Sequence, residues 1–251
     1  EAWKHQNGSM AEGSMVSQSN LFSESHDIAA EFDQWAQSGR GDRMAAGHRF
    51  ATLQLLENLA IAPDAVVLDA GCGIGWVLND LLGERIAAGV GIDLSDEMIA
   101  IAATRCTLPH LSFAVADSAN TGLESDRFSH IISIESLYYS PQPLDTLKEW
   151  GRLSKADGKL GLVIDLYQGN PAASHWVEAL PLTVHNLSAL GWQERLLSAG
   201  WSNVSYQQIP LPLQIEEEEF NVSSYFPSYE IYQAYCQAGS LLITAQKSRS
   251  S

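Results

Sequence analysis

Positive charge is scarce in this chain of 251 residues. Lysine and arginine together number 14, against 30 aspartates and glutamates, so the net charge is -16 at pH 7. Such a protein is repelled by a phosphate backbone, and no stripe of basic residues with interleaved aromatics is present. We therefore expect neither nucleic acid nor an anionic membrane surface as a partner. The charge also disfavours strongly anionic substrates, although a local pocket can override the overall field.

Cysteines and long apolar runs are few as well. The three cysteines, Cys72, Cys106 and Cys236, lie far apart and form no C-x-x-C pair, which favours a reduced, cytoplasmic protein. The seven histidines show no zinc-ligand spacing, so we expect no metal. No apolar run approaches the length of a membrane span. The amino end also lacks the apolar core of a signal peptide.

The bulk composition is that of one soluble globular domain. Hydrophobic residues make up 45% of the chain, and the mean hydropathy is -0.08. This length suits one sizeable α/β domain with an added cap better than two full domains. Gly-Ser-Met repeats at 8–10 and 13–15 are typical of cloning remnants, so residues 1–16 are expected to be a disordered tail. Residues 17–251 then form a single domain.

Apolar patterning divides this domain into a helical start and an alternating core. Amphipathic helices are predicted at 27–38 and 44–59, joined by a polar loop at 39–43, and they form a cover over 27–60. Strands and helices then alternate, which favours a parallel, doubly wound sheet. The predicted strands lie at 66–69, 87–92, 111–115, 128–134 and 160–166, with a turn at 155–159 before the fifth.

The end of the first strand carries the most specific signal. The strand ends in Asp69, and a helix begins at about Trp76. Glycines occupy alternate positions between them: Gly71, Gly73 and Gly75. Glycine lets the backbone turn tightly and lets a ligand lie against the main chain at the helix amino end. About twenty residues on, the second strand ends in Asp93, placed to accept hydrogen bonds from ribose hydroxyls.

These acids and glycines resemble the cofactor signature of class I S-adenosylmethionine-dependent methyltransferases. The spacing is G-x-G-x-G, whereas dinucleotide folds have G-x-G-x-x-G. An acid directly before the loop also suits a cationic amine better than a pyrophosphate. The resemblance extends over 66–167, and residues 196–201 resemble the A-G-F sequence that precedes strand six. It implies a Rossmann-like sheet of seven strands in the order 3-2-1-4-5-7-6, with strand seven antiparallel at 240–246.

Two insertions depart from a minimal version of that fold, whose core would be 65–167 and 187–246. They cover 168–186 and 210–238, and the second would form a cap. Its acidic run at 216–219 is expected to be a solvated face, with cation binding as the alternative. The aromatic stretch that follows is expected to pack a helix onto the body, with lining of a substrate pocket as the alternative. Its members are Phe220, Tyr225, Phe226, Tyr229, Tyr232 and Tyr235.

The resemblance assigns cofactor roles to residues at the carboxyl ends of the strands. Asp69 with the glycine loop would hold the methionine part, and Asp93 the ribose. Ionised carboxylates suit these positions because the amine and the hydroxyls need only acceptors. A turn cap is the alternative for Asp117, and a surface position is the alternative for Arg43 or Arg40 as partners of the cofactor carboxylate. The full set is Trp35, Arg43, Asp69, Gly71, Gly73, Asp93, Leu94, Met98, Asp117, Ser118 and Glu135.

The loop after strand four, 135–141, resembles that of natural-product sugar O-methyltransferases. Those enzymes have two histidines where this chain has Tyr138 and Tyr139, and an acid at the position of Asp165. These three residues are the catalytic candidates. Tyrosine is a weak base near neutral pH, and packing beneath a lid is the alternative for both tyrosines. His175 and His185, in the first insertion, are a further source of a base or simply surface residues.

The sequence thus predicts an S-adenosylmethionine-dependent methyltransferase that releases S-adenosylhomocysteine and acts on a small-molecule metabolite or natural product. O-methylation is favoured. N- or C-methylation, or a non-catalytic regulatory protein that binds the cofactor, are the alternatives. The expected partner is a small-molecule methyl acceptor, and the expected state is a monomer or a homodimer.

Overall fold

A seven-stranded sheet forms the centre of the computed structural model, which describes residues 18–248. The tail expected at 1–16 lies outside the described residues. The strand order is β3-β2-β1-β4-β5-β7-β6, as predicted. The strands are β1 (Val66–Ala70), β2 (Ala88–Asp93), β3 (Leu111–Val115), β4 (Phe128–Ile134), β5 (Ser154–Ile164), β6 (Trp201–Ile209) and β7 (Ser240–Lys247). The strands β1 to β5 pair in parallel, and β7 runs antiparallel between β5 and β6, again as predicted.

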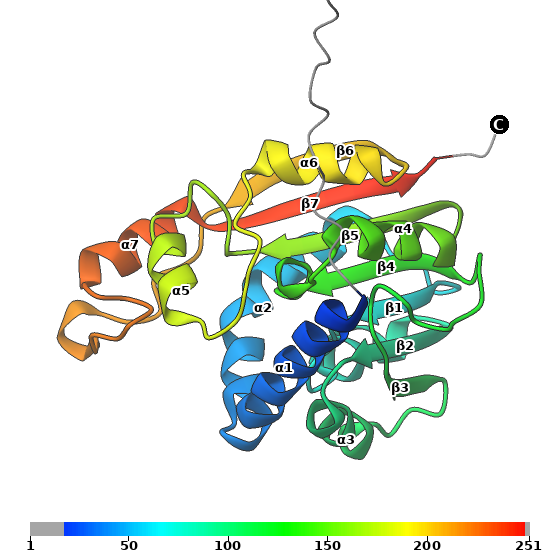
Figure 1. The fold of residues 1–251 in the computed structure, drawn as a ribbon, viewed down its shortest axis with the longest axis horizontal. Coiled ribbons are helices and arrows are strands. Elements are labelled where there is room, and N and C mark those ends of the chain that lie inside the picture. The colour runs from blue at the N-terminus through cyan, green and yellow to red at the C-terminus, as the bar shows by residue number, and fades with distance from the viewer. Residues whose placement is uncertain (1–17, 249–251) are drawn as a thin grey trace, which may run out of the picture.

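Helices surround the sheet and gather beyond its carboxyl edge (Figure 1). The longer ones are α1 (Gln18–Gln37), α2 (Arg40–Leu59), α3 (Asp96–Arg105), α4 (Pro143–Leu153), α6 (Ala189–Ser198) and α7 (Tyr229–Ala238). The shorter ones are η1 (Val77–Leu82), η2 (Gly83–Arg85), η3 (Leu137–Tyr139), α5 (Ala173–Ala179) and η4 (Glu217–Glu219). In Figure 1, β5 points toward α5 and α7, which come from the two insertions. No helix within residues 18–248 has the length and apolarity needed to cross a membrane.

The prediction of a polar loop at 39–43 is wrong, because α2 already begins at Arg40. Only Ser38 and Gly39 separate α1 from α2. Gly39 has φ 67, and a residue without Cβ adopts this left-handed conformation at little cost. The chain therefore reverses within two residues, and Arg40 and Arg43 belong to the first turn of a helix.

The prediction of a turn at 155–159 is also wrong in part. β5 begins at Ser154, and its pairing with β4 jumps from Phe128↔Ser154 to His130↔Lys159. Residues 155–158 therefore bulge out of the strand opposite the single residue Ser129. The fifth strand predicted at 160–166 therefore started six residues too late and ended two residues too late, since β5 spans Ser154–Ile164.

Helix α2 crosses the sheet over β5 and places its first half at the carboxyl edge. A Cβ on Gly161 of β5 would lie 2.7 Å from the Leu59 side chain, so helix and strand pack in close contact there. The Lys159 ammonium donates to the Leu59 carbonyl oxygen at 2.8 Å. The carboxyl end of α2 is thereby fixed near the start of β5. The residues of α2 three turns earlier, around His48, then lie at the end of β5.

Candidate active site

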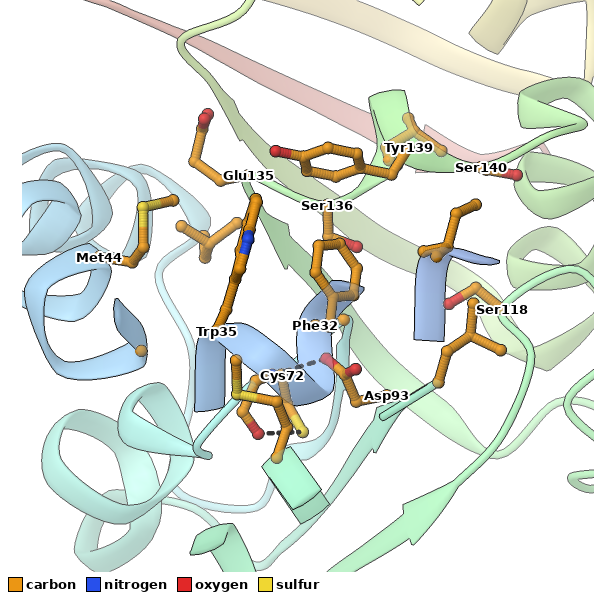
Figure 2. A pocket seen from close by; sticks show the side chains of 18 of the residues that line it. Phe32, Trp35, Met44, Cys72, Asp93, Ser118, Glu135, Ser136, Tyr139 and Ser140 are labelled. Carbon is orange, nitrogen blue, oxygen red and sulfur yellow. Dashed lines mark hydrogen bonds between the residues drawn. The ribbon is translucent and has the colours of Figure 1, made fainter. Parts of the chain in front are cut away.

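A cavity opens at the carboxyl ends of β1, β2 and β4 (Figure 2). The glycine loop after β1 forms its floor, and the loop after β4 forms the opposite wall. Gly71 has φ 74 and Gly73 has φ 51, both in the left-handed region. A Cβ on Gly71 would collide with the Ser136 side chain. The two loops can approach this closely only because residue 71 is glycine.

Asp93, at the end of β2, ties the glycine loop to the start of α3. Its Oδ2 accepts a hydrogen bond from the Gly73 amide at 2.9 Å, and its Oδ1 accepts one from the Ser95 amide at 3.0 Å. The Ser95 hydroxyl in turn accepts from the Met98 amide at 3.0 Å and so caps α3. Burial raises the pKa of Asp93, although these hydrogen bonds oppose that shift.

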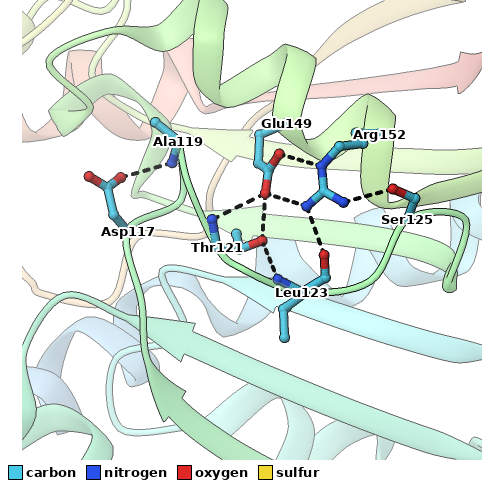
Figure 3. Close-up of polar contacts among 7 residues, drawn as sticks. All are labelled: Asp117, Ala119, Thr121, Leu123, Ser125, Glu149 and Arg152. Carbon is cyan, nitrogen blue, oxygen red and sulfur yellow. Dashed lines mark hydrogen bonds and ion pairs between the residues drawn. The ribbon is translucent and has the colours of Figure 1, made fainter.

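Asp117 and Ser118 reach the cavity from the loop after β3. Asp117 also caps a turn, because its Oδ1 accepts from the Ala119 amide at 2.8 Å. The rest of the loop is bound to α4 (Figure 3). Glu149 accepts from the Thr121 hydroxyl at 2.6 Å, and Arg152 donates to the Leu123 carbonyl oxygen at 2.8 Å. The loop is therefore held in place at both ends.

Helix α1 covers this cavity with two aromatic side chains. Figure 2 shows the Trp35 ring reaching into the cavity beside Phe32, and the two ring centroids are 5.0 Å apart. Both rings also contact Tyr139 from the loop after β4. Asp33 fixes the helix to α3 through a 2.5 Å hydrogen bond from the Ser95 hydroxyl. The cover is thus bound to the same residue that caps α3.

A second, larger cavity lies between α2 and the two insertions. Its volume is about 610 Å³, against about 130 Å³ for the first. Its insertion wall is mainly aromatic: Trp176, Tyr225, Phe226, Tyr232 and Tyr235. The aromatic stretch therefore packs α7, as expected, and part of it also lines a pocket. Lining a pocket was the alternative interpretation. The acidic run at 216–219 is exposed, as expected.

The two cavities meet at one group of residues. Met44, His48, Glu135 and Tyr139 line both of them. A ligand at the first cavity and a ligand at the second can therefore approach each other there. Glu135 adopts φ 55, which is uncommon for a residue with a Cβ. Such backbone strain costs about 1–3 kcal/mol and gathers at functional sites, where the surroundings hold it in place.

His48, Glu135 and Asp165 form a buried polar cluster at this junction. His48 Nδ1 lies 2.8 Å from the Met44 carbonyl oxygen. Since a carbonyl oxygen only accepts, Nδ1 carries a proton and Nε2 faces the two acids. Nε2 is 3.3 Å from Asp165 Oδ2 and 3.8 Å from Glu135 Oε2. Glu135 Oε1 accepts from the Asp165 amide at 2.5 Å, which fixes the two acids side by side.

Two tyrosine hydroxyls complete the cluster. Tyr138 donates to Glu135 Oε2 at 2.7 Å, and Tyr235 of α7 donates to Asp165 Oδ2 at 2.6 Å. The three acid and histidine ligand atoms lie within 4.8 Å of one another, close enough to hold a metal ion. Because hydroxyl donors and the His48–Asp165 ion pair already occupy these oxygens, we interpret the group as a proton-holding cluster.

Burial and the contacts within the cluster shift the pKa values of its members in different directions. Burial opposes the charge on His48, but its contacts with Asp165 and Glu135 prevail and raise the pKa to about 9. Burial also acts against the charge of Asp165, yet the His48 contact keeps the pKa of this carboxyl below its usual value. Burial, together with the Asp165 charge, raises the pKa of Glu135 to about 8. His48 and Asp165 thus form an ion pair near neutral pH, and Glu135 gains or loses a proton within the physiological range.

The chain is similar to methyltransferases in sequence and in structure. A family described as "Methyltransferase domain" matches residues 68–162. Methyltransferase GfsG of Streptomyces halstedii is 27% identical over 142 residues, which are 55% of this chain and 51% of that protein. Phosphoethanolamine N-methyltransferase 1 of Zea mays is 28% identical over 173 residues, which are 64% of this chain and 33% of that protein. The chain thus spans about half of the first of these curated relatives and a third of the second.

A solved structure extends the similarity to most of the fold. It is a methyltransferase in complex with the Haloferax volcanii Trm112 methyltransferase activator. It superposes with a TM-score of 0.79 at 28% identity, covering 87% of this chain and 98% of its own. Residues 68–162 therefore match a methyltransferase domain, and the chain as a whole has the fold of class I S-adenosylmethionine-dependent methyltransferases.

The first cavity of this methyltransferase has features that fit S-adenosylmethionine. Asp69, directly before the glycine loop, is 1% exposed, and neither of its carboxylate oxygens has a hydrogen-bond partner. Burial and the Asp93 charge raise the pKa of Asp69 to about 8. A buried carboxyl without a partner is unfavourable, and the cationic amine of this cofactor would supply one. Asp93 retains lone pairs that ribose hydroxyls can use.

Nine of the eleven residues assigned to the cofactor line the first cavity of the methyltransferase. They are Trp35, Gly71, Gly73, Asp93, Leu94, Met98, Asp117, Ser118 and Glu135. Asp69 lies beneath the glycine loop and does not line it. Arg43, together with Arg40, lines the second cavity. Glu135 lines both, so its position suits contact with the acceptor as well as with the cofactor.

The three catalytic candidates of the methyltransferase are all in the cluster region but differ in access. Tyr139 lines both cavities and Tyr138 lines the second. Asp165 is 0% exposed and lines neither, but its Oδ2 lies 3.3 Å from Nε2 of His48, which lines both. Burial raises the pKa of both tyrosines, which makes them weaker acids still. Their hydroxyls are therefore protonated donors.

His48 is the residue of this methyltransferase that sequence reasoning missed. The two histidines considered for a base, His175 and His185, line neither cavity. The buried stripe of α2 contains His48, Ala51, Thr52, Leu55, Leu56 and Leu59. A histidine at the start of a mainly apolar stripe was the available signal, because a buried polar side chain requires a partner.

Proposed function

We propose that this methyltransferase transfers a methyl group to a hydroxyl of a small, largely apolar molecule that binds in the second cavity. The observation that carries the proposal is the junction, where the two cavities meet at His48, Glu135 and Tyr139. An acceptor placed between the aromatic residues can present its hydroxyl at that point. Holding the reacting atoms together in a closed site accounts for much of the rate of such a reaction.

The buried cluster favours oxygen over nitrogen as the acceptor atom. The bound cofactor would supply a methyl group already activated on a sulfonium sulfur. A hydroxyl loses its proton as it is methylated, whereas a neutral amine needs no base. Glu135 is the cluster carboxyl that reaches both cavities, so we assign it as the proton acceptor. The cation of His48 then compensates the charge of Glu135, and the Asp165 backbone amide positions its carboxylate.

Methylation of an amine remains the rival activity, because one relative is named as an N-methyltransferase. The test supplies isotope-labelled S-adenosylmethionine and a small-molecule extract, and locates the label by mass spectrometry. Two model acceptors, phenylphenol and aminobiphenyl, are assayed in the same way. They share one apolar body and differ in the acceptor atom, which is oxygen in phenylphenol and nitrogen in aminobiphenyl. We expect the label on oxygen, at a rate that falls in the Glu135→Gln variant. Label on nitrogen or carbon alone would contradict the proposal.

A protein activator is not part of this proposal, although the Haloferax volcanii relative was solved with one. Both cavities are lined by side chains of this chain, including the cover helix α1 and the cap helix α7. We therefore propose that the purified chain is active without a partner. Turnover that appears only after a protein of the Trm112 kind is added would contradict this point.

A further inference from the structure

Two arginines on the first turn of α2 line the acceptor cavity, and neither has an acidic partner within the described part of the chain. Arg40 and Arg43 are three residues apart and so lie on one face of the helix. The ion pairs of residues 18–248 that involve arginine use Arg105 and Arg152. Two guanidinium groups therefore stand at the cavity without a carboxylate to neutralise them.

Both guanidinium groups are held in place by other contacts. The Arg40 Cζ lies 3.6 Å from the centroid of the Trp35 ring, and its Nη1 donates to the Tyr225 hydroxyl at 3.1 Å. Arg43 Nη1 donates to the Ser38 carbonyl oxygen at 3.2 Å. Each guanidinium carries five N–H donors. Among the described residues these bonds use one donor of each, which leaves a fork for a planar oxyanion.

The charge of the cavity wall is the reverse of the charge of the whole chain. The only acid among its lining residues is Glu135, at the junction with the first cavity. The net charge of the chain is -16, but apart from the junction residues His48 and Glu135 the charged lining residues of this cavity are Arg40 and Arg43. The acidic run at 216–219 is exposed and does not line the cavity. A local field of this kind can select an anion against the overall charge.

We propose that the methyl acceptor carries an oxyanion, such as a carboxylate or a sulfonate, which Arg40 and Arg43 bind in the second cavity. The apolar body of the acceptor then lies against Trp176 and Phe226, with its hydroxyl directed toward Glu135. The inference rests on the proposed function, since it takes the second cavity as the acceptor site. The other source of an oxyanion is the carboxylate of the cofactor, and the test separates the two.

The test measures binding and needs no turnover. The probes are anilinonaphthalene sulfonate and phenylnaphthylamine, which share one apolar body and differ by the sulfonate. Their fluorescence is titrated with saturating S-adenosylhomocysteine present. We expect the wild-type chain to bind the sulfonate probe about tenfold or more tightly than the neutral one. Arg43→Gln should weaken only the sulfonate probe, by about tenfold, the loss of one charge-assisted hydrogen bond.

The matched control is Arg49→Gln, on the same helix but exposed and outside both cavities. It should leave both probes and the affinity for S-adenosylhomocysteine unchanged. Arg40→Gln should behave like Arg43→Gln toward the sulfonate. Because Arg40 also stacks on Trp35, Arg40→Lys serves as a second variant that keeps the charge and should retain part of the preference.

Three results would overturn the inference. The first is a wild-type chain that binds the two probes equally, or the sulfonate less well. The second is equal loss for both probes in Arg43→Gln, which would make the arginine a packing residue. The third is weaker binding of S-adenosylhomocysteine in Arg43→Gln, which would assign the arginine to the cofactor carboxylate. Label found on nitrogen in the methylation test would instead contradict the proposed function and leave the preference for the sulfonate probe standing.

Discussion

The two cavities of this methyltransferase are built from different parts of the chain. The first is formed mainly by strand ends and the short loops that follow them, with further lining residues from α1, α2 and α4. The second takes its walls from α2 and from two insertions that are far apart in sequence. Under the proposed function, the fold would fix the cofactor site, whereas the insertions would fix the choice of acceptor.

The two sets of residues meet at the junction, where Glu135 directly follows strand β4 and His48 lies on helix α2. Their alignment depends on the packing of α2 over β5 and on the left-handed backbone of Glu135. Substitutions at the junction should therefore affect the reaction itself, whereas substitutions on either side should affect one ligand only. The predictions below use this contrast, beginning with the largest effect.

The largest effect is expected for Glu135→Gln. The variant keeps the shape of the side chain but removes the group assigned to accept the hydroxyl proton. General-base catalysis contributes roughly 10²- to 10⁴-fold, so turnover should fall by about a hundredfold or more. The affinity for S-adenosylhomocysteine, measured by calorimetric titration, should change by only a few fold. An unchanged turnover would remove Glu135 from the reaction and favour an acceptor that needs no base.

The second prediction concerns the cofactor side alone. Asp93→Ala should weaken binding of S-adenosylhomocysteine by roughly tenfold to a hundredfold, the value of a charge-assisted hydrogen bond. Part of that loss would come from the Gly73 amide, which Asp93 also binds. Asp93→Asn keeps an acceptor oxygen and should lose less. Binding of the neutral naphthylamine probe should be unaffected in both variants, and unchanged S-adenosylhomocysteine affinity would refute the assignment.

The same contrast explains which features the sequence could predict. The sheet order and nine lining residues of the first cavity were predicted from the resemblance to the methyltransferase family, which rests on short motifs at the ends of strands. The start of α2 at Arg40 was not predictable in this way. The glycines Gly39 and Gly41 and the polar residues beside them are as typical of a loop as of the first turn of a helix. The pairing of His48 with Asp165 depends on how a helix crosses a strand more than a hundred residues later. No local pattern specifies that contact.

A third prediction uses the titration of the junction. The pKa of Glu135 is raised to about 8, and Glu135 must be ionised to accept a proton. Turnover should therefore fall as the pH drops below about 8, approaching tenfold per pH unit at lower pH. The cation of His48 lowers the pKa of Glu135, so His48→Gln should move this limb to higher pH. A profile that is flat from pH 6 to 9, with chemistry shown to limit the rate, would contradict the assignment.

The smallest effect is expected from the tyrosine hydroxyls, and the two tyrosines form a matched pair. Tyr138 donates to Glu135 at 2.7 Å, whereas Tyr139 mainly packs against Phe32 and Trp35. Tyr138→Phe removes a hydrogen bond that stabilises the ionised form of Glu135, so the acid limb of turnover should move to higher pH. The net value of such a bond to a charged group is about 1.5–3 kcal/mol, and part of it is recovered by rearrangement.

At pH 7 we therefore expect a loss of a few fold to about tenfold for Tyr138→Phe. Tyr139→Phe keeps the ring contacts and should leave both the rate and the position of the limb nearly unchanged. Neither variant should alter the affinity for S-adenosylhomocysteine by more than a few fold. If Tyr139→Phe moved the pH limb and Tyr138→Phe did not, the hydroxyl of Tyr139 would be the one that acts on the proton acceptor. The acceptor hydroxyl would then approach from the first cavity, on the side of α1.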